Sequence, residues 1–291
     1  MGRTSHSSGS ANIVIIGAGL GGLICANHLT DRGFADDLVV VEARSAPGGR
    51  ARTESIGGGA LNLGPHALGV GGPLAATLRN WDLWPTGEKV RGGWAVDDGE
   101  LYRLPAGPLS LLRTRLFPGL ARALFLALVA KLRRLDAADF RTQSARSFLD
   151  ERCGDPRVRR GLTALARLTT YVADLEHLSA DVLIERFQHT LDGVLYVDGG
   201  WQTMVDGLTD RLAERGVTVR CDTRVETIEK TTESLRVHQV GSEVFPAEAA
   251  ILAVGPSRAA RLLGDELARE AGLDQKSEPV RAAWLDLVLE R

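Results

Sequence analysis

The sequence has few cysteines and almost no net charge. Its three cysteines, Cys25, Cys153 and Cys221, form no CxxC pair, so neither a disulfide framework nor a zinc site is expected, and no spacing of ligand residues predicts another metal. The 35 Lys and Arg residues nearly balance 37 Asp and Glu residues, for a net charge of −2. Without a global positive field, the chain is not expected to bind nucleic acid.

Long apolar runs are also missing. Residues 1–10 are polar, lack the apolar core of a signal peptide and are predicted to form a disordered tail. The longest uncharged piece of the most apolar region, residues 123–130, is too short for a transmembrane span, which needs about 20 apolar residues. We therefore expect a cytoplasmic protein.

Glycine, in contrast, is abundant, with 33 of 291 residues and no collagen-like period. Such glycines are expected at turns and close backbone approaches, which favours a nucleotide-binding fold. Residues 13–16 are a continuous β-branched run and residues 38–41 a continuous apolar run, both typical of parallel strands buried on both faces. Residues 20–30 between them predict a helix that Gly33 ends, so the three segments form a βαβ unit.

Along the rest of the chain, the predicted secondary structure indicates an α/β domain that is split by a mostly helical insertion. We place the first part of the nucleotide-binding domain at residues 11–104, the helical substrate or cap domain at 105–192 and the return segment at 193–262. Residues 263–291 are expected to begin a further sheet, with a strand over 282–289. Between 43 and 100 we expect mainly loops, with a hairpin around Asp98-Gly99. Helices are predicted over 116–135, 145–151, 157–172, 180–191 and 202–215, and strands over 217–219, 234–240 and 250–254.

The strongest motif is G-x-G-x-x-G, which runs from Gly17 to Gly22 between the first strand and the first helix. Gly17 permits the tight turn, Gly19 lets the backbone approach a pyrophosphate, and Gly22 allows the helix to pack on the strand. Gly21 lies at the helix N-terminus, whose free N–H groups attract phosphate. An acid follows 20 positions after Gly22 and is placed to bind a ribose: Glu42. NAD and FAD share this fingerprint, so the motif alone leaves the dinucleotide open.

The segment after Glu42 favours FAD through a resemblance. With Arg44 and Gly48-Gly49-Arg50, the sequence resembles the flavin-dependent amine oxidase, phytoene desaturase and protoporphyrinogen oxidase superfamily, whose members carry E-x-R-x-x-x-G-G-R here. The resemblance implies a Rossmann-like FAD-binding domain of the glutathione-reductase type. It places Arg44 near the adenosine part of FAD and Arg50 near the pyrophosphate, and Ala43 and Gly49 belong to the same cofactor-binding set.

Two later segments extend the resemblance. Residues 61–66 resemble the family segment that runs beside the flavin ring, which adds Gly64, Pro65 and His66 to the cofactor-binding set. His66 is the candidate catalytic residue, and a structural histidine is the alternative. Residues 197–201 resemble the turn where the chain re-enters the cofactor domain, and Val225 is expected to bring its backbone to the adenine.

The expected function is that of an FAD-dependent oxidoreductase, which takes a hydride from a C–N or C–C bond of a small or lipophilic substrate. Flavin supplies that chemistry, so few acid or base residues are needed. The glycine-acid segment with which the family clasps the flavin end is not found here, so a truncated, non-catalytic nucleotide-binding chain is the alternative. A simple NAD-dependent dehydrogenase is a third hypothesis.

Residues 109–135 are rich in Leu and Phe, and their only charges are six Arg and Lys residues. Basic amphipathic helices can lie on membranes, so two interpretations stay open for this segment: peripheral contact with a membrane surface, or ordinary packing between domains. The sequence does not predict the substrate, the electron acceptor or the oligomeric state.

Overall fold

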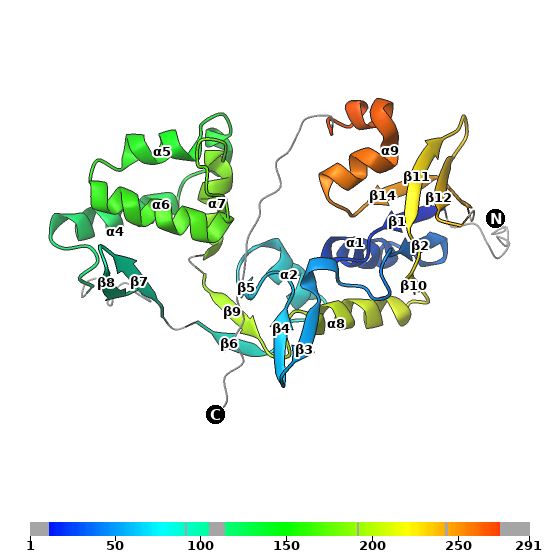
Figure 1. Ribbon diagram of the computed structural model, residues 1–291, viewed down its shortest axis with the longest axis horizontal. Helices are drawn as coiled ribbons and strands as arrows, with labels where there is room; N and C mark the ends of the chain where they lie inside the picture. Colours follow the sequence, from blue (N-terminus) through cyan, green and yellow to red (C-terminus); the bar gives the residue numbers. More distant parts are fainter. Residues whose placement is uncertain (1–11, 91, 105–113, 191, 242–243, 274–291) are drawn as a thin grey trace.

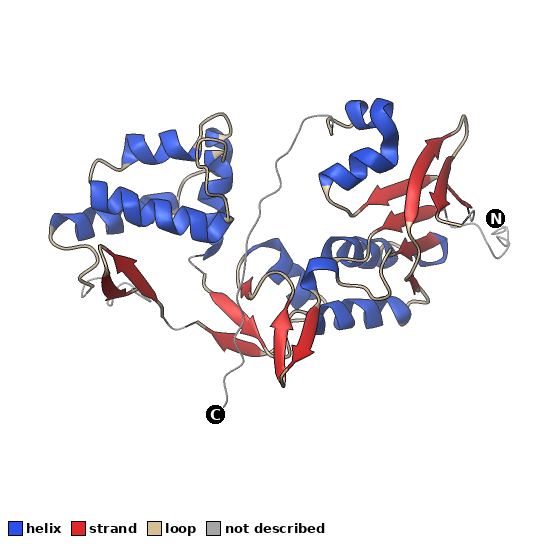
Figure 2. Ribbon diagram, viewed as in Figure 1, coloured by secondary structure: helices blue, strands red, loops and turns tan. Residues whose placement is uncertain are grey.

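The computed structural model of the chain describes residues 12–90, 92–104, 114–190, 192–241 and 244–273. It has an α/β lobe and a lobe built mainly of helices, which Figures 1 and 2 show side by side. The two lobes are joined through strands β6 (Gly87–Lys89) and β9 (Val194–Val197). The predicted tail, residues 1–10, and the predicted strand, residues 282–289, lie outside the described residues.

A four-stranded parallel sheet forms the centre of the α/β lobe, in the order β10-β2-β1-β14. Strands β1 (Ile13–Ile16) and β2 (Leu38–Val41) confirm the predicted strands, and α1 (Leu20–Asp31) confirms the helix between them. Strand β10 (Val219–Arg220) is shorter and later than predicted, and β14 (Ala249–Leu252) shifts by about one residue.

The sheet is buried on both faces, as its continuous apolar runs predict. Ile15 and Val40 pack with α1 and α8 (Gln202–Ala213) in one core, whereas Val14 and Val39 point to the opposite face. That second face is covered by the antiparallel strands β11 (Val225–Lys230), β12 (Leu235–Gln239) and β13 (Val244–Ala247) and by α9 (Pro256–Glu270). Figure 1 shows the sheet between these two layers.

Helix α9 corrects one expected boundary. Its residues continue past position 262, where a new sheet was expected to begin, so the described residues 263–270 are helical. The helix is interrupted at Gly264, whose φ of 71° is a left-handed value that glycine adopts readily.

Residues 43–100 contain far more regular structure than the expected loops. They form η2 (Gly49–Ala51), β3 (Thr53–Ile56), β4 (Gly59–Asn62), β5 (Ala67–Gly69), α2 (Gly72–Asn80), β6 (Gly87–Lys89), and the hairpin of β7 (Trp94–Asp97) and β8 (Glu100–Arg103). The hairpin around Asp98-Gly99 is confirmed. Strands β5 and β6 pair with β9 (Val194–Val197), which lies more than a hundred residues further along the chain, so local periodicity could not reveal them.

The helical lobe has its own apolar core. It contains α4 (Leu120–Leu132), η3 (Ala137–Phe140), α5 (Ala145–Arg152), α6 (Pro156–Thr170) and α7 (Ala180–Thr190), packed around Phe148, Leu162 and Leu183. Helix α4 begins four residues later than predicted, because Pro118 and Gly119, with φ 56°, precede it. In the part of the chain that is described, no helix has the length and apolar character needed to cross a membrane.

Candidate cofactor site

The glycine motif forms the turn between β1 and α1, where two glycines are required by the fold itself. Gly17 has φ 106°, its N–H donates to the Val41 carbonyl at 2.8 Å, and a Cβ there would lie 2.7 Å from the Ala253 carbonyl oxygen. A Cβ on Gly22 would overlap the Gly17 carbonyl oxygen. These two residues therefore let α1 pack directly on β1, as the motif predicts.

Gly19 and Gly21 have no such structural reason to be glycine. Gly19 has an ordinary φ of −74°, and the nearest atom to a Cβ there is the Gly48 carbonyl oxygen at 3.9 Å. A Cβ on Gly21 would have no neighbour within 4 Å. The space beside Gly19 is therefore open, with the Gly48 carbonyl oxygen as its nearest atom; we call this open space, which a ligand can enter, the cradle at Gly19.

The same turn leaves the N-terminus of α1 free to bind an anion. Its N-cap is Gly19, no side chain caps it, and its first turn carries no acidic residue. The first N–H groups of a helix point outward and carry a partial positive charge. This geometry fits the phosphates of a dinucleotide.

Glu42 lies at the end of β2 with its carboxylate held beside the glycine turn. The side chain is only 9% exposed; Oε2 accepts from the Ala18 N–H at 2.9 Å and Oε1 from the Arg44 N–H at 3.0 Å. Each carboxylate oxygen can accept a further hydrogen bond, so the orientation is fixed while capacity remains for a ribose hydroxyl.

The Gly-Gly-Arg segment contacts the same turn. Gly48 donates its N–H to the Ala18 carbonyl at 2.7 Å, and a Cβ on Gly49 would lie 3.5 Å from the Gly19 Cα. Arg44 and Arg50 are exposed, and neither guanidinium has an ion-pair partner among the described residues. Two positive charges next to an anion-binding turn favour a phosphate-bearing ligand.

The remaining predicted residues adjoin this site through the backbone. A Cβ on Gly64 would overlap the Arg50 carbonyl oxygen, so the segment Gly64-Pro65-His66 packs against η2, and His66 is half-buried just before β5. The chain before Val225 is joined to β2, since the Thr223 N–H donates to the Glu42 carbonyl at 2.8 Å. The Val225 carbonyl itself accepts from Arg258 at 2.6 Å.

Sequence reasoning missed one polar cluster near the site. The Asn62 Oδ1 accepts from the Trp201 N–H at 2.9 Å, and the Thr53 hydroxyl donates to Asn62 at 2.7 Å and accepts from the Gln202 N–H at 3.1 Å. Strands β3 and β4 thus cap the N-terminus of α8 and hold the turn at Gly200. The two halves of the cluster are 139 positions apart, and no local motif joins them.

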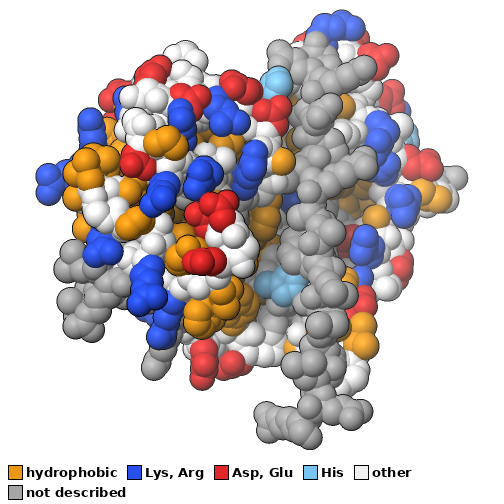
Figure 3. Space-filling view, turned by 60° about the vertical axis from the view of Figure 1, so that its left-hand side comes forward, with side chains coloured by type: hydrophobic (Ala, Val, Ile, Leu, Met, Phe, Trp, Pro, Cys, Tyr) orange, Lys and Arg blue, Asp and Glu red, His pale blue; other side chains and the backbone are white. Residues whose placement is uncertain are grey.

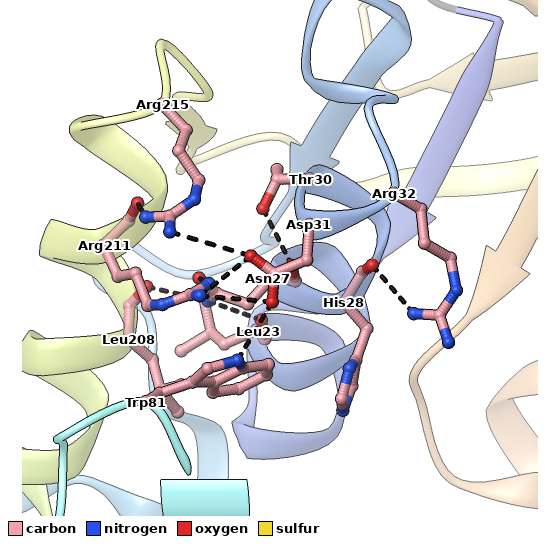
Figure 4. Close-up of polar contacts among 10 residues, drawn as sticks. All are labelled: Leu23, Asn27, His28, Thr30, Asp31, Arg32, Trp81, Leu208, Arg211 and Arg215. Carbon is pink, nitrogen blue, oxygen red and sulfur yellow. Dashed lines mark hydrogen bonds and ion pairs between the residues drawn. The ribbon is translucent and has the colours of Figure 1, made fainter.

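The far end of α1 is fixed to α8 by a network centred on Asn27, which is fully buried (Figure 4). Its amide donates to the carbonyls of Leu23 at 2.9 Å and Leu208 at 3.0 Å, and its oxygen accepts from Arg211 at 2.9 Å. Arg211 also donates to Asp31 at 2.8 Å. Burial works to raise the pKa of Asp31, but the hydrogen bond and charge of Arg211 outweigh it and lower that pKa.

The parallel sheet, its glycine turn and the acid at the end of β2 define a dinucleotide-binding α/β fold. The family model for flavin containing amine oxidoreductases matches residues 20–283, so the chain belongs to that family, whose cofactor is a flavin. This confirms the superfamily expected from the sequence. The exact way in which a helical insertion splits this fold stays a prediction.

Three oxidoreductases are among the proteins similar to this chain. A phytoene dehydrogenase of Streptomyces griseus is 26% identical over 87% of this chain and 56% of its own length. An oxidoreductase from Methanosarcina mazei has a TM-score of 0.70 and 20% identity, over 89% of this chain and 62% of that one. A putrescine oxidase bound to putrescine has a TM-score of 0.66 and 23% identity, over 87% and 60%. The structures show the shared fold, and the chain spans somewhat more than half the length of these proteins.

Proposed function

We propose that the chain binds FAD at the β1–α1 turn and serves an oxidoreductase that takes a hydride from a C–N or C–C bond of a small or lipophilic substrate. The observation that carries the proposal is the open cradle at Gly19, beside the uncapped N-terminus of α1 and the oriented carboxylate of Glu42. Membership in a flavin-containing family supports FAD as the ligand.

Each part of the site has a role in this proposal. The N–H groups at the start of α1, from Gly19 to Gly22, with Arg50, hold the pyrophosphate, and Glu42 accepts hydrogen bonds from the ribose. Arg44, Ala43 and the backbone near Val225 adjoin the adenosine part. The bound flavin supplies the hydride acceptor. His66, with Gly64 and Pro65, would lie beside the reacting end of the flavin, as the family resemblance implies, and is the candidate catalytic residue.

Retention of FAD tests the cofactor assignment. Purified chain is mixed with FAD and passed through gel filtration, and the flavin that stays with the protein is measured. Gly19→Val and Glu42→Ala should lose most of it, whereas Glu266→Ala, which changes an exposed acid on α9, should retain it. Unchanged flavin content in both site variants would defeat the assignment.

Calorimetric titration separates FAD from NAD. The extension with Arg44 and Arg50 is typical of the flavin-dependent family that the sequence resembles, and a simple NAD domain does not need it. We expect FAD to bind and NADH not to compete. Tight binding of NADH without binding of FAD would instead support a dehydrogenase.

The substrate class can be tested once flavin is retained. Similar proteins are named for phytoene and for putrescine, so an apolar polyene and a diamine are the first two candidates. The productive class should bleach the oxidised flavin under anaerobic conditions. His66→Ala should slow this bleaching without reducing flavin content, and an unchanged rate would remove His66 from the catalytic set.

A further inference from the structure

Helix α4 is apolar on its solvent-facing side as well as on its buried side. Leu120 and Leu124 are 74% and 43% exposed, while Ala121 and Leu132 are buried in the core of the helical lobe. The exposed positions follow helical spacing along one face: Leu120, Ala123, Leu124, Ala127 and Ala130. A helix on the surface of a water-soluble domain normally turns charged and polar side chains to solvent.

The β7–β8 hairpin presents a second exposed apolar face beside α4 (Figure 1). Trp94, Val96 and Leu101 are 64%, 72% and 62% exposed. Val96 pairs with Leu101, and Trp94 lies two residues from Val96, so all three side chains are on one face of the ribbon. We call Trp94, Val96, Leu101, Leu120 and Leu124 the α4–hairpin surface.

Hydrogen bonds through Thr114 join the two elements. Its hydroxyl donates to the carbonyl of Arg103, the last residue of β8, at 3.4 Å. Its own carbonyl accepts from the guanidinium of Arg122 on α4 at 2.7 Å. The hairpin and the first turns of α4 are therefore neighbours held in a fixed relation.

The charge along α4 has one sign. Residues 114–135 contain five basic residues and no acid, in a chain whose net charge is −2; Lys131, Arg133 and Arg134 are exposed at the end of the helix. The acids of the hairpin lie at its turn, where Asp97 pairs with Arg160 of α6 at 3.5 Å. Figure 3 shows hydrophobic side chains on one face of this lobe, with Lys and Arg and also Asp and Glu side chains among them.

We propose that the α4–hairpin surface docks on an anionic lipid bilayer, with α4 lying in the plane of the interface. Apolar side chains bordered by basic ones, with an exposed tryptophan, match the chemistry of that interface. A contact between two copies of α4 would offer Lys131, Arg133 and Arg134 no acidic partner on the facing helix, since residues 114–135 contain no acid, whereas an anionic surface would offer one. A helix of 13 residues is about 20 Å long and lies on the membrane rather than crossing it.

Co-sedimentation with vesicles tests the docking. The full chain is mixed with vesicles of pure phosphatidylcholine or of an equimolar mixture with phosphatidylglycerol, at low and high salt. We expect sedimentation with the anionic vesicles, weakened by salt. Neutralising Lys131, Arg133 and Arg134 together to Gln should weaken the affinity roughly a hundredfold, about fivefold for each charge. Neutralising Lys230, Arg236 and Arg269, exposed residues of the other lobe, is the matched control and should have little effect.

The apolar contribution is tested separately with Leu120→Gln combined with Leu124→Gln, against Ile56→Ser in the other lobe, which is also exposed. Circular dichroism shows whether each variant folds, and the charge variant leaves the apolar core unchanged. Absence of wild-type sedimentation with either vesicle would overturn the proposal. The proposal would also be overturned if the variant with Leu120→Gln and Leu124→Gln lost a dimer and kept vesicle binding, because that result assigns the surface to a second copy of the chain.

Discussion

Replacing Gly19 by Ala should separate flavin binding from folding. Gly19 has φ −74° and ψ 177°, values that alanine adopts without strain, and the new Cβ would lie 3.9 Å from the Gly48 carbonyl oxygen, an ordinary contact. The flavin-free variant should therefore stay within about 1 kcal/mol of the wild-type stability, because the loss of unfolded-state entropy and the poorer preference of alanine for an N-cap position oppose each other. The added methyl group would occupy the space that the pyrophosphate needs. Overpacking of this kind costs about 1–3 kcal/mol, which weakens FAD binding roughly 5- to 150-fold.

Two neighbouring glycines serve as controls. Gly22→Ala should lower the free energy of unfolding by about 1–3 kcal/mol or more, because its Cβ overlaps the Gly17 carbonyl oxygen and α1 must move off β1. Gly21→Ala keeps the backbone N–H and meets no atom within 4 Å, so it should retain both stability and FAD. Urea unfolding of the flavin-free chain and quenching of flavin fluorescence measure the two quantities. FAD binding by Gly19→Ala as tight as that of the wild type would refute the assignment of the cradle.

Three further substitutions test the hydrogen bonds that hold the glycine turn and helix α1 in place. Glu42→Gln removes an acceptor from one of two backbone N–H groups, so it should cost about 1–3 kcal/mol in urea unfolding and weaken FAD binding; equal stability would contradict the role of the carboxylate. Asn27→Ala removes a hydrogen bond to the Leu208 carbonyl and the acceptor of one Arg211 N–H group, so a similar loss is expected. A melting temperature like that of the wild type would count against the network. Because the pKa of Asp31 is lowered in the folded state, the Asp31 carboxylate stabilises the fold above the unfolded pKa of about 3.9, and this stabilisation is lost as pH falls through the folded pKa. Asp31→Asn should therefore flatten that part of the acid unfolding curve. An unfolding curve identical to that of the wild type would exclude a contribution of Asp31 to stability.

The first βαβ unit could be predicted because its signals are local. Continuous apolar runs marked β1 and β2, and Gly33 marked the end of α1, since each signal depends on a few adjacent residues. The sheet of β5, β9 and β6 could not be predicted in this way. Its short strands are stabilised by partners more than a hundred residues away, so no periodic pattern of useful length distinguishes them from loops.

The same difference between local signals and contacts of distant segments applies to the candidate site. The spacing of Gly17 and Gly22 predicted the turn and the close packing that the structure contains, because the motif encodes a backbone geometry. The hydrogen bond from the Ala18 N–H to Glu42 was not predicted, and the role of Glu42 toward a ribose stays a prediction. The capping of α8 by Thr53 and Asn62 depends on the meeting of distant segments, and polar residues in short strands carry no signal of it. The roles of Val225 and His66 toward a cofactor stay predictions.

The most direct test of FAD binding at the β1–α1 turn is the visible absorption spectrum of the purified chain, recorded after FAD has been added and the excess removed by gel filtration. The cradle at Gly19, the free N-terminus of α1 and the carboxylate of Glu42 predict flavin bands that elute with the protein and are lost in Gly19→Val. A folded protein that elutes colourless would contradict that prediction.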